Sequence, residues 1–143
     1  MVGENHVIVR YRSNYDTDGN GCVSFIDQSG KQYLYTQFPP YYCHRVFPVF
    51  DQPDLKARMK LNVIAPSHWS VISNESSLYA APFDVAEYLM NTSKLASDII
   101  GEYLQGCEGY NMHFHLQTEL LSSYLFCFVA GEFVELVCPN PYK

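Results

Sequence analysis

Apolar and polar residues alternate along the segment Leu55–Ala65. Successive side chains of a β-strand point to opposite faces of a sheet, so this pattern predicts a strand with one buried face and one solvated face. The apolar positions are Leu55, Ala57, Met59, Leu61 and Val63, and the polar positions are Lys56, Arg58, Lys60 and Asn62. Such a half-buried strand is typical of an antiparallel sheet that covers a core on one side.

Other segments rich in β-branched and aromatic residues extend this prediction along the chain. The predicted strands are His6–Arg12, Cys22–Asp27, Gln32–Phe38, Trp69–Asn74, Tyr124–Ala130 and Phe133–Val137, and the strand pattern resumes at Met112. We expect Trp69–Asn74 to pair with the strand before it, across the turn formers at 66–68. Prolines at 39, 40, 48 and 53 remove backbone donors, so residues 38–54 are expected to form an ordered but irregular loop.

One stretch has a helical pattern instead. Asp84 and Glu87 have the spacing of a capping box, and apolar residues then recur at helical spacing up to Gly106, a residue suited to a helix end. These signals predict one or two helices between Phe83 and Gln105. They lie within an insertion, residues 77–111, that separates two strand-rich parts of the chain.

The composition excludes several classes of protein. With 48% hydrophobic and 17% charged residues, the 143-residue chain is globular. A net charge of −6 and nine scattered basic residues argue against a nucleic-acid partner. No apolar run approaches the ~20 residues of a membrane span, and the first residues have no basic start or apolar core, so we expect no signal peptide. The five cysteines form no Cys-x-x-Cys pair, so we expect reduced thiols and a cytoplasmic location.

The segment from Asp16 to Asp27 resembles a calcium-binding loop. Asp16, Asp18 and Asn20 occupy the first oxygen-ligand positions, Gly21 follows, and Asp27 stands where an EF-hand carries its bidentate glutamate. An EF-hand also needs a helix on each side, and both flanks here are strand-like. The same residues suit a β-turn followed by a strand. We interpret the segment as a turn and retain a calcium-sensing module as a third functional hypothesis.

Histidines and cysteines suggest two further sites. His113 and His115 would share one face of a strand, but no third zinc ligand is evident, so surface or cross-strand positions are expected. Cys43 and His44 are adjacent in the sequence and would point apart, so Cys43 is expected to be structural. The sequence contains no H-E-x-x-H, G-x-G-x-x-G, G-x-x-x-x-G-K or G-x-S-x-G motif. No catalytic residue is predicted.

The segment Tyr35–Ala57 resembles the signature of the aminopeptidase N family, which reads T-Q-F-E-P and then A-R-x-x-F-P-C-F-D-E-P-x-x-K-A. The similarity continues through Leu61–Asn74. Gly3–Val7 and Tyr15–Gly21 resemble the strand and hairpin that precede the signature in that family. Downstream, its F-x-x-T-x-x-x-S-x-Y-L segment is matched by Phe114, Thr118, Ser123–Phe126 and Val129–Phe133. The resemblance covers nearly the whole chain except Ser77–Asn111.

This resemblance implies a fold and a set of site positions. Residues 1–143 would be the second half of an N-terminal β domain: mainly β, a partial saddle-like antiparallel β-sandwich with a helical insertion around residues 83–106. The family's zinc and catalytic motifs belong to a separate domain, so no metal or other cofactor is expected in this chain. Pro39 replaces the glutamate that holds the substrate's α-amino group, so no substrate-binding residue is expected. Gln37, Arg45, Asp51 and Lys56 are expected to fix the loop structurally.

Two functions follow from the resemblance. The first is a non-catalytic structural or interaction subunit of a larger assembly, in which a protein partner or a missing domain covers an exposed β edge. The alternative is a fragment of an active cytosolic zinc aminopeptidase that removes N-terminal residues from peptides. Pro39 and the missing H-E-x-x-H motif favour the first.

Overall fold

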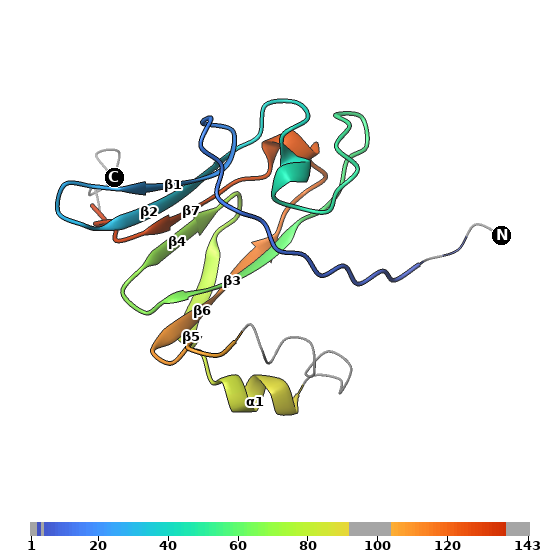
Figure 1. Cartoon of the computed structure of the whole chain (residues 1–143). Coiled ribbons are helices and arrows are strands. Elements are labelled where there is room, and N and C mark those ends of the chain that lie inside the picture. The colour runs from blue at the N-terminus through green and yellow to red at the C-terminus, as the bar shows by residue number, and fades with distance from the viewer. Residues whose placement is uncertain (1–2, 4, 92–103, 137–143) are drawn as a thin grey trace, which may run out of the picture.

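Two antiparallel β-sheets form the computed structural model, which describes residues 3, 5–91 and 104–136 (Figure 1). The first sheet has the strand order β1-β2-β7-β4, and the second has the order β3-β6-β5. The strands are β1 (Gly21–Ile26), β2 (Gln32–Gln37), β3 (Lys60–Pro66), β4 (Ser70–Ser73), β5 (Ser77–Pro82), β6 (Tyr110–Gln117) and β7 (Phe128–Gly131). The prediction of a mainly β, antiparallel sandwich is confirmed.

Helical segments are short in the described chain. They are the 3-10 turns η1 (Cys43–Arg45) and η2 (Ser123–Leu125) and the helix α1 (Val85–Met90). α1 follows Asp84, whose Oδ1 accepts a hydrogen bond from the backbone N–H of Glu87 at 2.9 Å, as half of the predicted capping box. The rest of the predicted helical stretch, 92–103, lies outside the described residues. No helix in the described ranges is long and apolar enough to cross a membrane.

Side-chain caps and one glycine set the register of the first sheet. Asp27 closes the β1–β2 turn, because its Oδ1 accepts hydrogen bonds from the backbone N–H groups of Ser29 (2.8 Å) and Lys31 (3.0 Å). On the other side of β2, Gly131 of β7 pairs with Tyr33. A Cβ at residue 131 would lie 2.7 Å from Tyr33 Cδ1, so a glycine is needed for β7 to approach β2 this closely.

Two clusters of buried apolar side chains form the core. The first joins β1 to the loop after β2 and to the segment after η2, and contains Cys22, Phe38, Cys43, Val46 and Phe126. The second joins the two sheets, and contains Ala65 of β3, Val71 of β4 and Ala130 of β7. The second cluster therefore gives the two layers a shared interior.

Several strand predictions differ from the structure. The predicted strand Leu55–Ala65 begins only at Lys60, because Ala57 instead pairs with Leu121 in an isolated bridge. His6–Arg12 is exposed and forms no strand, since no described strand pairs with it. The segment 133–136 likewise forms no strand, and Val137 lies outside the described residues. Ser77–Pro82 is a strand, although it was predicted to lie within the helical insertion.

The predicted pairing of Trp69–Asn74, the segment that contains β4, is also wrong. Trp69 N–H donates to Pro66 O at 2.9 Å in the expected tight turn. After this turn the chain passes to the other sheet, where β4 pairs with β7, while β3 pairs with β6. The change of sheet lets Val71 and Ala65 face the same core from opposite layers.

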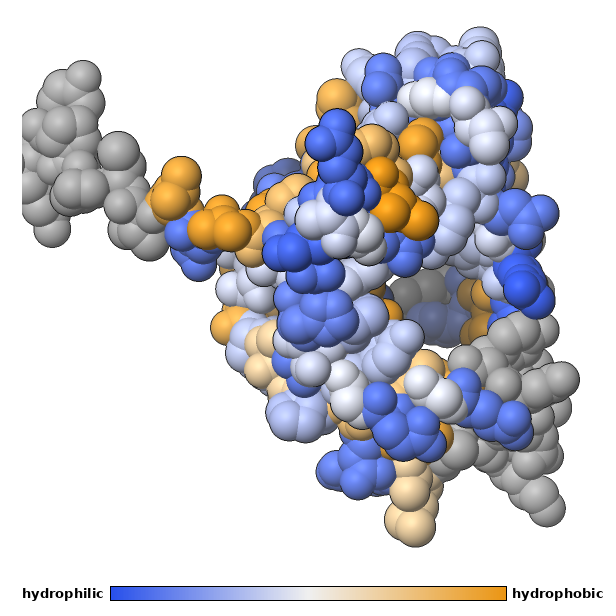
Figure 2. Space-filling view, turned by 60° about the vertical axis from the view of Figure 1, so that its left-hand side comes forward, coloured by the Kyte–Doolittle hydropathy of each residue, from blue (hydrophilic) through white to orange (hydrophobic). Residues whose placement is uncertain are grey.

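Large apolar side chains remain exposed on the described surface. Val7 is 78% exposed and Ile8 is 85% exposed, and Leu78 on β5 is 53% exposed. Figure 2 shows apolar atoms open to solvent among polar ones on one face of the molecule. No described strand pairs with the outer side of a terminal strand in either sheet, although Asp16 forms an isolated bridge with Val23 of β1. Open edges of this kind are templates for pairing with another polypeptide.

Candidate functional site

The loop between β2 and β3, residues 38–59, contains most of the predicted site positions. It begins with a tight turn in which the backbone N–H of Tyr42 donates to Pro39 O at 3.0 Å. Tyr41, in the third position of this turn, has a φ of 78°, a left-handed conformation that glycine or asparagine normally occupies. The turn therefore holds a 65% exposed tyrosine on a strained backbone.

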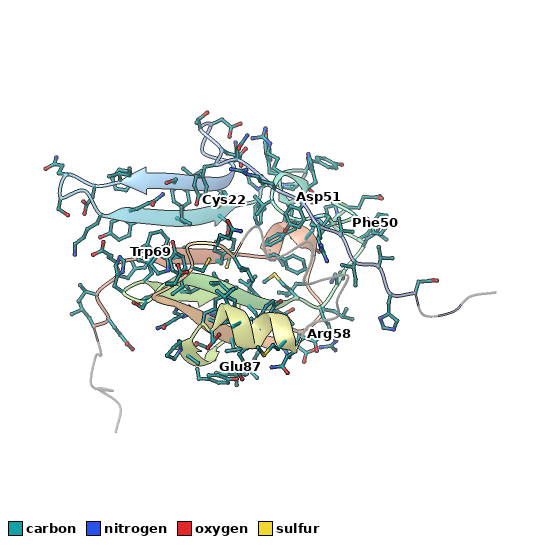
Figure 3. The ribbon with its side chains drawn as sticks, turned by 60° about the horizontal axis from the view of Figure 1, so that its bottom comes forward. Cys22, Phe50, Asp51, Arg58, Trp69 and Glu87 are labelled. Atoms are coloured by element: carbon teal, nitrogen blue, oxygen red, sulfur yellow. The ribbon has the colours of Figure 1, made fainter. Side chains whose placement is uncertain are left out.

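Asp51 is the main anchor of this loop. Its Oδ2 accepts a hydrogen bond from the backbone N–H of His44 at 3.0 Å and lies 3.0 Å from His44 Nδ1, and its Oδ1 accepts from Ser123 Oγ at 2.7 Å. Burial raises the pKa of Asp51, but the hydrogen bonds from Ser123 and His44 outweigh it, so the net pKa is lowered. Figure 3 shows Asp51 close to Phe50 and away from Glu87 of α1. One carboxylate thus ties η1 to η2.

The residue types around Asp51 are those of a catalytic triad, but their order differs. In a triad the imidazole lies between the serine and the carboxylate, so that it can take the serine proton. Here the carboxylate of Asp51 lies between Ser123 and His44. Ser123 therefore has no imidazole beside it and donates to a carboxylate of lowered pKa, which is a weak base, so this arrangement fixes the loop.

Further hydrogen bonds join the end of the loop to the segment after β6. Ala57 and Leu121 exchange two backbone hydrogen bonds of 2.9 and 3.0 Å. Thr118 is 1% exposed, and its Oγ1 accepts a hydrogen bond from the backbone N–H of Met59 at 2.9 Å. The loop and the segment after β6, both of which resemble aminopeptidase sequences, are therefore bound to each other.

Arg45 is the second anchor of the loop. Its Nη1 lies 3.2 Å from Asp16 Oδ1 and 2.9 Å from Asp18 Oδ2. Its guanidinium lies 4.4 Å from the centre of the Tyr42 ring, and its backbone oxygen accepts a hydrogen bond from Ser13 Oγ at 2.7 Å. The hydrogen bond from Arg45 lowers the pKa of Asp18. Two acids of the calcium-loop pattern therefore neutralise an arginine.

The structure separates the remaining acid of the calcium-loop pattern from these two. Asp27 follows β1, whose six residues extend about 20 Å at the usual rise per residue. At the near end, Asp16 Oδ2 accepts from the backbone N–H of Cys22 at 3.0 Å, and a Cβ at Gly21 would lie 2.0 Å from that oxygen. Asn20 donates its backbone N–H to Asp18 Oδ1 at 3.1 Å. The segment is a turn and a strand.

The other three predicted positions lie at the surface of the loop. Gln37 ends β2, and its backbone pairs with Gly21. The side chains of Gln37 and Lys56 are exposed and form no hydrogen bond or ion pair with the residues that the structure describes. Pro39 is half-buried and offers only its backbone oxygen, which the turn uses.

Cys22 and Cys43 are buried thiols of the first core cluster. Burial and the nearby charge of Asp51 raise the pKa of Cys43 to about 12. Burial and the charge of Asp16 likewise raise the pKa of Cys22 to about 11. The thiolate is the nucleophilic form of cysteine, so these protonated thiols act as packing residues.

His113 and His115 share one face of β6, but they lie in the interior and not at the surface. They are 6% and 1% exposed, and His115 Nε2 lies 3.4 Å from Val71 O of β4. His113 Nε2 and His115 Nδ1 have no hydrogen-bond partner among the described residues. Burial, and then the charge of His115, lower the pKa of His113. Of the two positions expected for this pair, surface or cross-strand, the surface position is wrong, and His113 has cross-strand neighbours in β3 and β5.

Sequence patterns do not single out the residues that hold the loop in place. His44, Thr118 and Ser123 supply the bonds to the loop. Thr118 and Ser123 belong to the segment that resembles the aminopeptidase family, and this resemblance is the sequence feature that could have pointed to them. The role of His44 depends on a backbone geometry that sequence spacing does not specify.

The described residues form an antiparallel two-sheet β domain with a hydrogen-bonded loop between β2 and β3. Residues 4–92 match the Peptidase M1 N-terminal domain, and the chain belongs to this family.

Known relatives are aminopeptidases that are much longer than this chain. Aminopeptidase N of Streptomyces lividans is 45% identical over 75 residues, which are 52% of this chain and 9% of that protein. Probable M1 family aminopeptidase 1 of Encephalitozoon cuniculi (strain GB-M1) is 28% identical over 104 residues, with coverages of 69% and 12%. Probable aminopeptidase 1 of Saccharolobus solfataricus is 25% identical over 133 residues, with coverages of 93% and 14%. The chain spans about a tenth of the length of these relatives.

M1 family aminopeptidases are zinc enzymes, and the described residues do not fit a zinc site. No three His, Cys, Asp or Glu side chains in the described ranges are grouped so that they could hold a metal. The buried histidines of β6 supply two nitrogens, while a catalytic zinc needs three protein ligands.

Proposed function

We propose that this chain is a non-catalytic β scaffold within a larger aminopeptidase-type assembly, where another polypeptide covers its open β surface. The supporting observation is the exposure of Val7 and Ile8, whose apolar side chains lie in a segment with the composition of a strand and are 78% and 85% exposed. Apolar side chains of this size are normally buried in a stable protein. The covering polypeptide is either a partner protein or a further part of the same protein.

The loop chemistry supports the non-catalytic part of the proposal. Arg45 and Asp51 are used in ion pairs and hydrogen bonds that hold the loop. Pro39 stands where the aminopeptidase N signature has a glutamate, and it has no side-chain acceptor for a substrate amine. The free thiols of Cys22 and Cys43 in one cluster support a reducing compartment, and we propose a cytoplasmic location on that basis.

A second candidate function is that the chain is part of an active aminopeptidase, with its catalytic groups outside these residues. The observation that favours it is the 45% identity to Aminopeptidase N over 75 residues. In that case the loop would position the β layer against a catalytic domain. An in-frame H-E-x-x-H motif downstream in the coding sequence would place this candidate first.

An assay of the purified 143-residue chain tests the catalytic side of the proposal. We expect no hydrolysis of an aminoacyl coumarin reporter above the blank, with or without added zinc, and no zinc retained after dialysis. Turnover that rises with bound zinc and stops with a chelator would contradict the proposal.

A further inference from the structure

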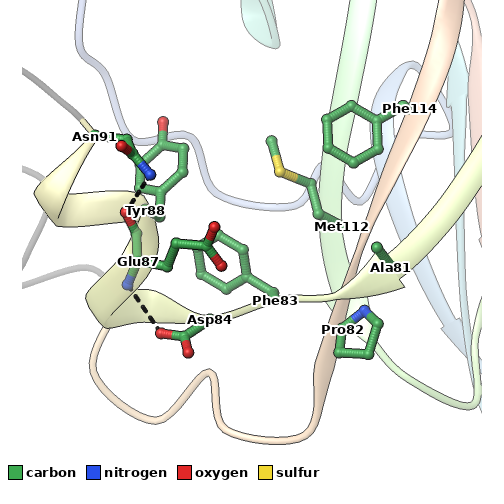
Figure 4. A pocket seen from close by; sticks show the side chains of 9 residues that line it. All are labelled: Ala81, Pro82, Phe83, Asp84, Glu87, Tyr88, Asn91, Met112 and Phe114. Atoms are coloured by element: carbon green, nitrogen blue, oxygen red, sulfur yellow. Dashed lines mark hydrogen bonds between the residues drawn. The ribbon is translucent and has the colours of Figure 1, made fainter.

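A pocket lies between α1 and the second sheet, apart from the loop described above. Its volume is about 220 Å³, which suits one small molecule or one side chain. Phe83, Tyr88, Phe114 and Met112 line it, together with Glu87 and Asn91 (Figure 4). Neither the aminopeptidase resemblance nor the zinc chemistry of that family accounts for this pocket.

The aromatic walls of the pocket are held by packing. Phe83 is 9% exposed, and its ring lies 5.4 Å from the ring of Tyr88, measured between centroids. On the opposite wall, Phe114 is stacked on Tyr79 with a centroid separation of 4.6 Å and an interplanar angle of 27°. Aromatic faces carry partial negative charge, so a pocket walled by them favours a cation.

Glu87 provides a full negative charge at the same place. Figure 4 shows its side chain extending from α1 toward the side of the pocket that Met112 lines. The helix backbone fixes its position, because Glu87 N–H donates to Asp84 Oδ1 at 2.9 Å and Glu87 O accepts from Asn91 Nδ2 at 3.0 Å. Within the described chain the Glu87 carboxylate has no hydrogen bond or ion pair, and no lysine or arginine lines the pocket.

We propose that this pocket binds an organic cation: an ammonium or guanidinium group carried on an apolar stem. The charged head would lie at the Glu87 carboxylate, and the stem would lie between the rings of Phe83 and Phe114 and against Met112. A free amine and the side chain of a lysine on another polypeptide share this chemistry. The proposal is independent of the scaffold role.

Nuclear magnetic resonance of the 143-residue chain with ¹³C-methyl-labelled methionines tests the proposal. The probes are 2-phenylethylammonium for a free amine, Nα-acetyl-lysine methylamide for a lysine side chain, and 3-phenylpropanoate as the anionic counterpart. We expect a saturable shift of the Met112 methyl signal with a Kd on the order of 1 mM for a ligand of this size. The Met90 signal serves as an internal reference, because Met90 is 84% exposed and does not line the pocket.

The variant Glu87→Gln keeps the shape and removes the charge, and it should weaken cation binding about fivefold. Glu108→Gln is the matched control, because Glu108 is exposed near α1 and does not line the pocket. Binding of either cation with this selectivity supports the proposal, and the probe that binds more tightly identifies the source of the cation. Equal binding of the propanoate, equal loss in both variants, or no shift with either cation would overturn it.

Discussion

Two residues of the β2–β3 loop, Tyr41 and Asp51, show how local chemistry sets the shape of this region. Tyr41 occupies a left-handed backbone position in a turn that would suit glycine. Asp51 satisfies three donors from two separate segments. Tyr41 lowers the stability of the fold and Asp51 raises it. Substitutions at the two positions should therefore change the free energy of unfolding in opposite directions.

Replacing Tyr41 by glycine should stabilise the chain. Glycine adopts a positive φ without a steric penalty, and the strain removed exceeds the chain entropy that glycine adds, so the free energy of unfolding should rise by about 0.5–1 kcal/mol. The measurement is urea unfolding. Tyr41→Ala is the control, since it removes the same ring and keeps the strain. If alanine and glycine gave equal stability, the turn would not be strained.

Replacing Asp51 by asparagine should destabilise the chain by about 2 kcal/mol, because an amide cannot accept from both His44 and Ser123 in this geometry. Asp54→Asn, at an exposed position of the same loop, should change stability little. Because the pKa of Asp51 is lowered in the folded state, Asp51 contributes fully to the free energy of unfolding above its ordinary pKa of 3.8. This contribution is lost as the pH falls through the pKa of the folded state. An acid transition of identical shape in both variants would contradict this role.

At the scale of elements, the turn chemistry and alternation predict the β1–β2 hairpin well, because those signals are local. The strand predicted at Tyr124–Ala130 is wrong in its first part, since Ser123–Leu125 form η2 and β7 begins at Phe128. β5 is missed since Ser77–Pro82 has no alternating apolar pattern and is defined by its pairing with β6. The sheet change after Trp69 is missed for a related reason. A tight turn predicts that the chain reverses, and only the shared core of Ala65 and Val71 decides that the next strand joins the other layer.

In the candidate site, too, local sequence signals were predictive and contacts between distant segments were not. The aminopeptidase resemblance includes both the loop and the segment from Thr118 to Ser123 that is bonded to it. It does not identify which atoms bond, because the bonds of Asp51 to His44 and Ser123 depend on how η1 and η2 are placed in space. The calcium-loop pattern shows the converse case. Its spacing is correct for a ligand set, and the strand β1 carries Asp27 away from the other acids.

The interior face of β6 should make folding sensitive to mild acid. The pKa of His113 is lowered from its ordinary value of 6.5, so the folded state favours the neutral form and the unfolded state binds the proton more readily. Stability should therefore be complete above pH 6.5 and decrease as pH falls below it. Unfolding free energies between pH 8 and pH 5.5 measure this. His113→Gln should flatten the curve, and the exposed His68→Gln should not; the same slope in all three proteins would exclude His113.

At the scale of the whole molecule, the β domain buries some of its apolar groups and leaves others exposed. The two core clusters hold the sheets together, yet apolar residues on the N-terminal segment and on β5 remain open to water. The M1 relatives contain far more chain than this one. A scaffold whose open surface is completed by another polypeptide accounts for both observations.

The molar mass of the purified chain, measured by light scattering over a range of concentrations, tests this account most directly. Exposed strand-like apolar segments should drive association, so we expect a mass that rises with concentration. The double variant Val7→Lys, Ile8→Lys should shift the chain toward monomer, while Gln28→Lys, Gln105→Lys adds the same charge at exposed polar positions and should not. A stable monomer of 16.4 kDa at every concentration, with no effect of either variant, would contradict the account.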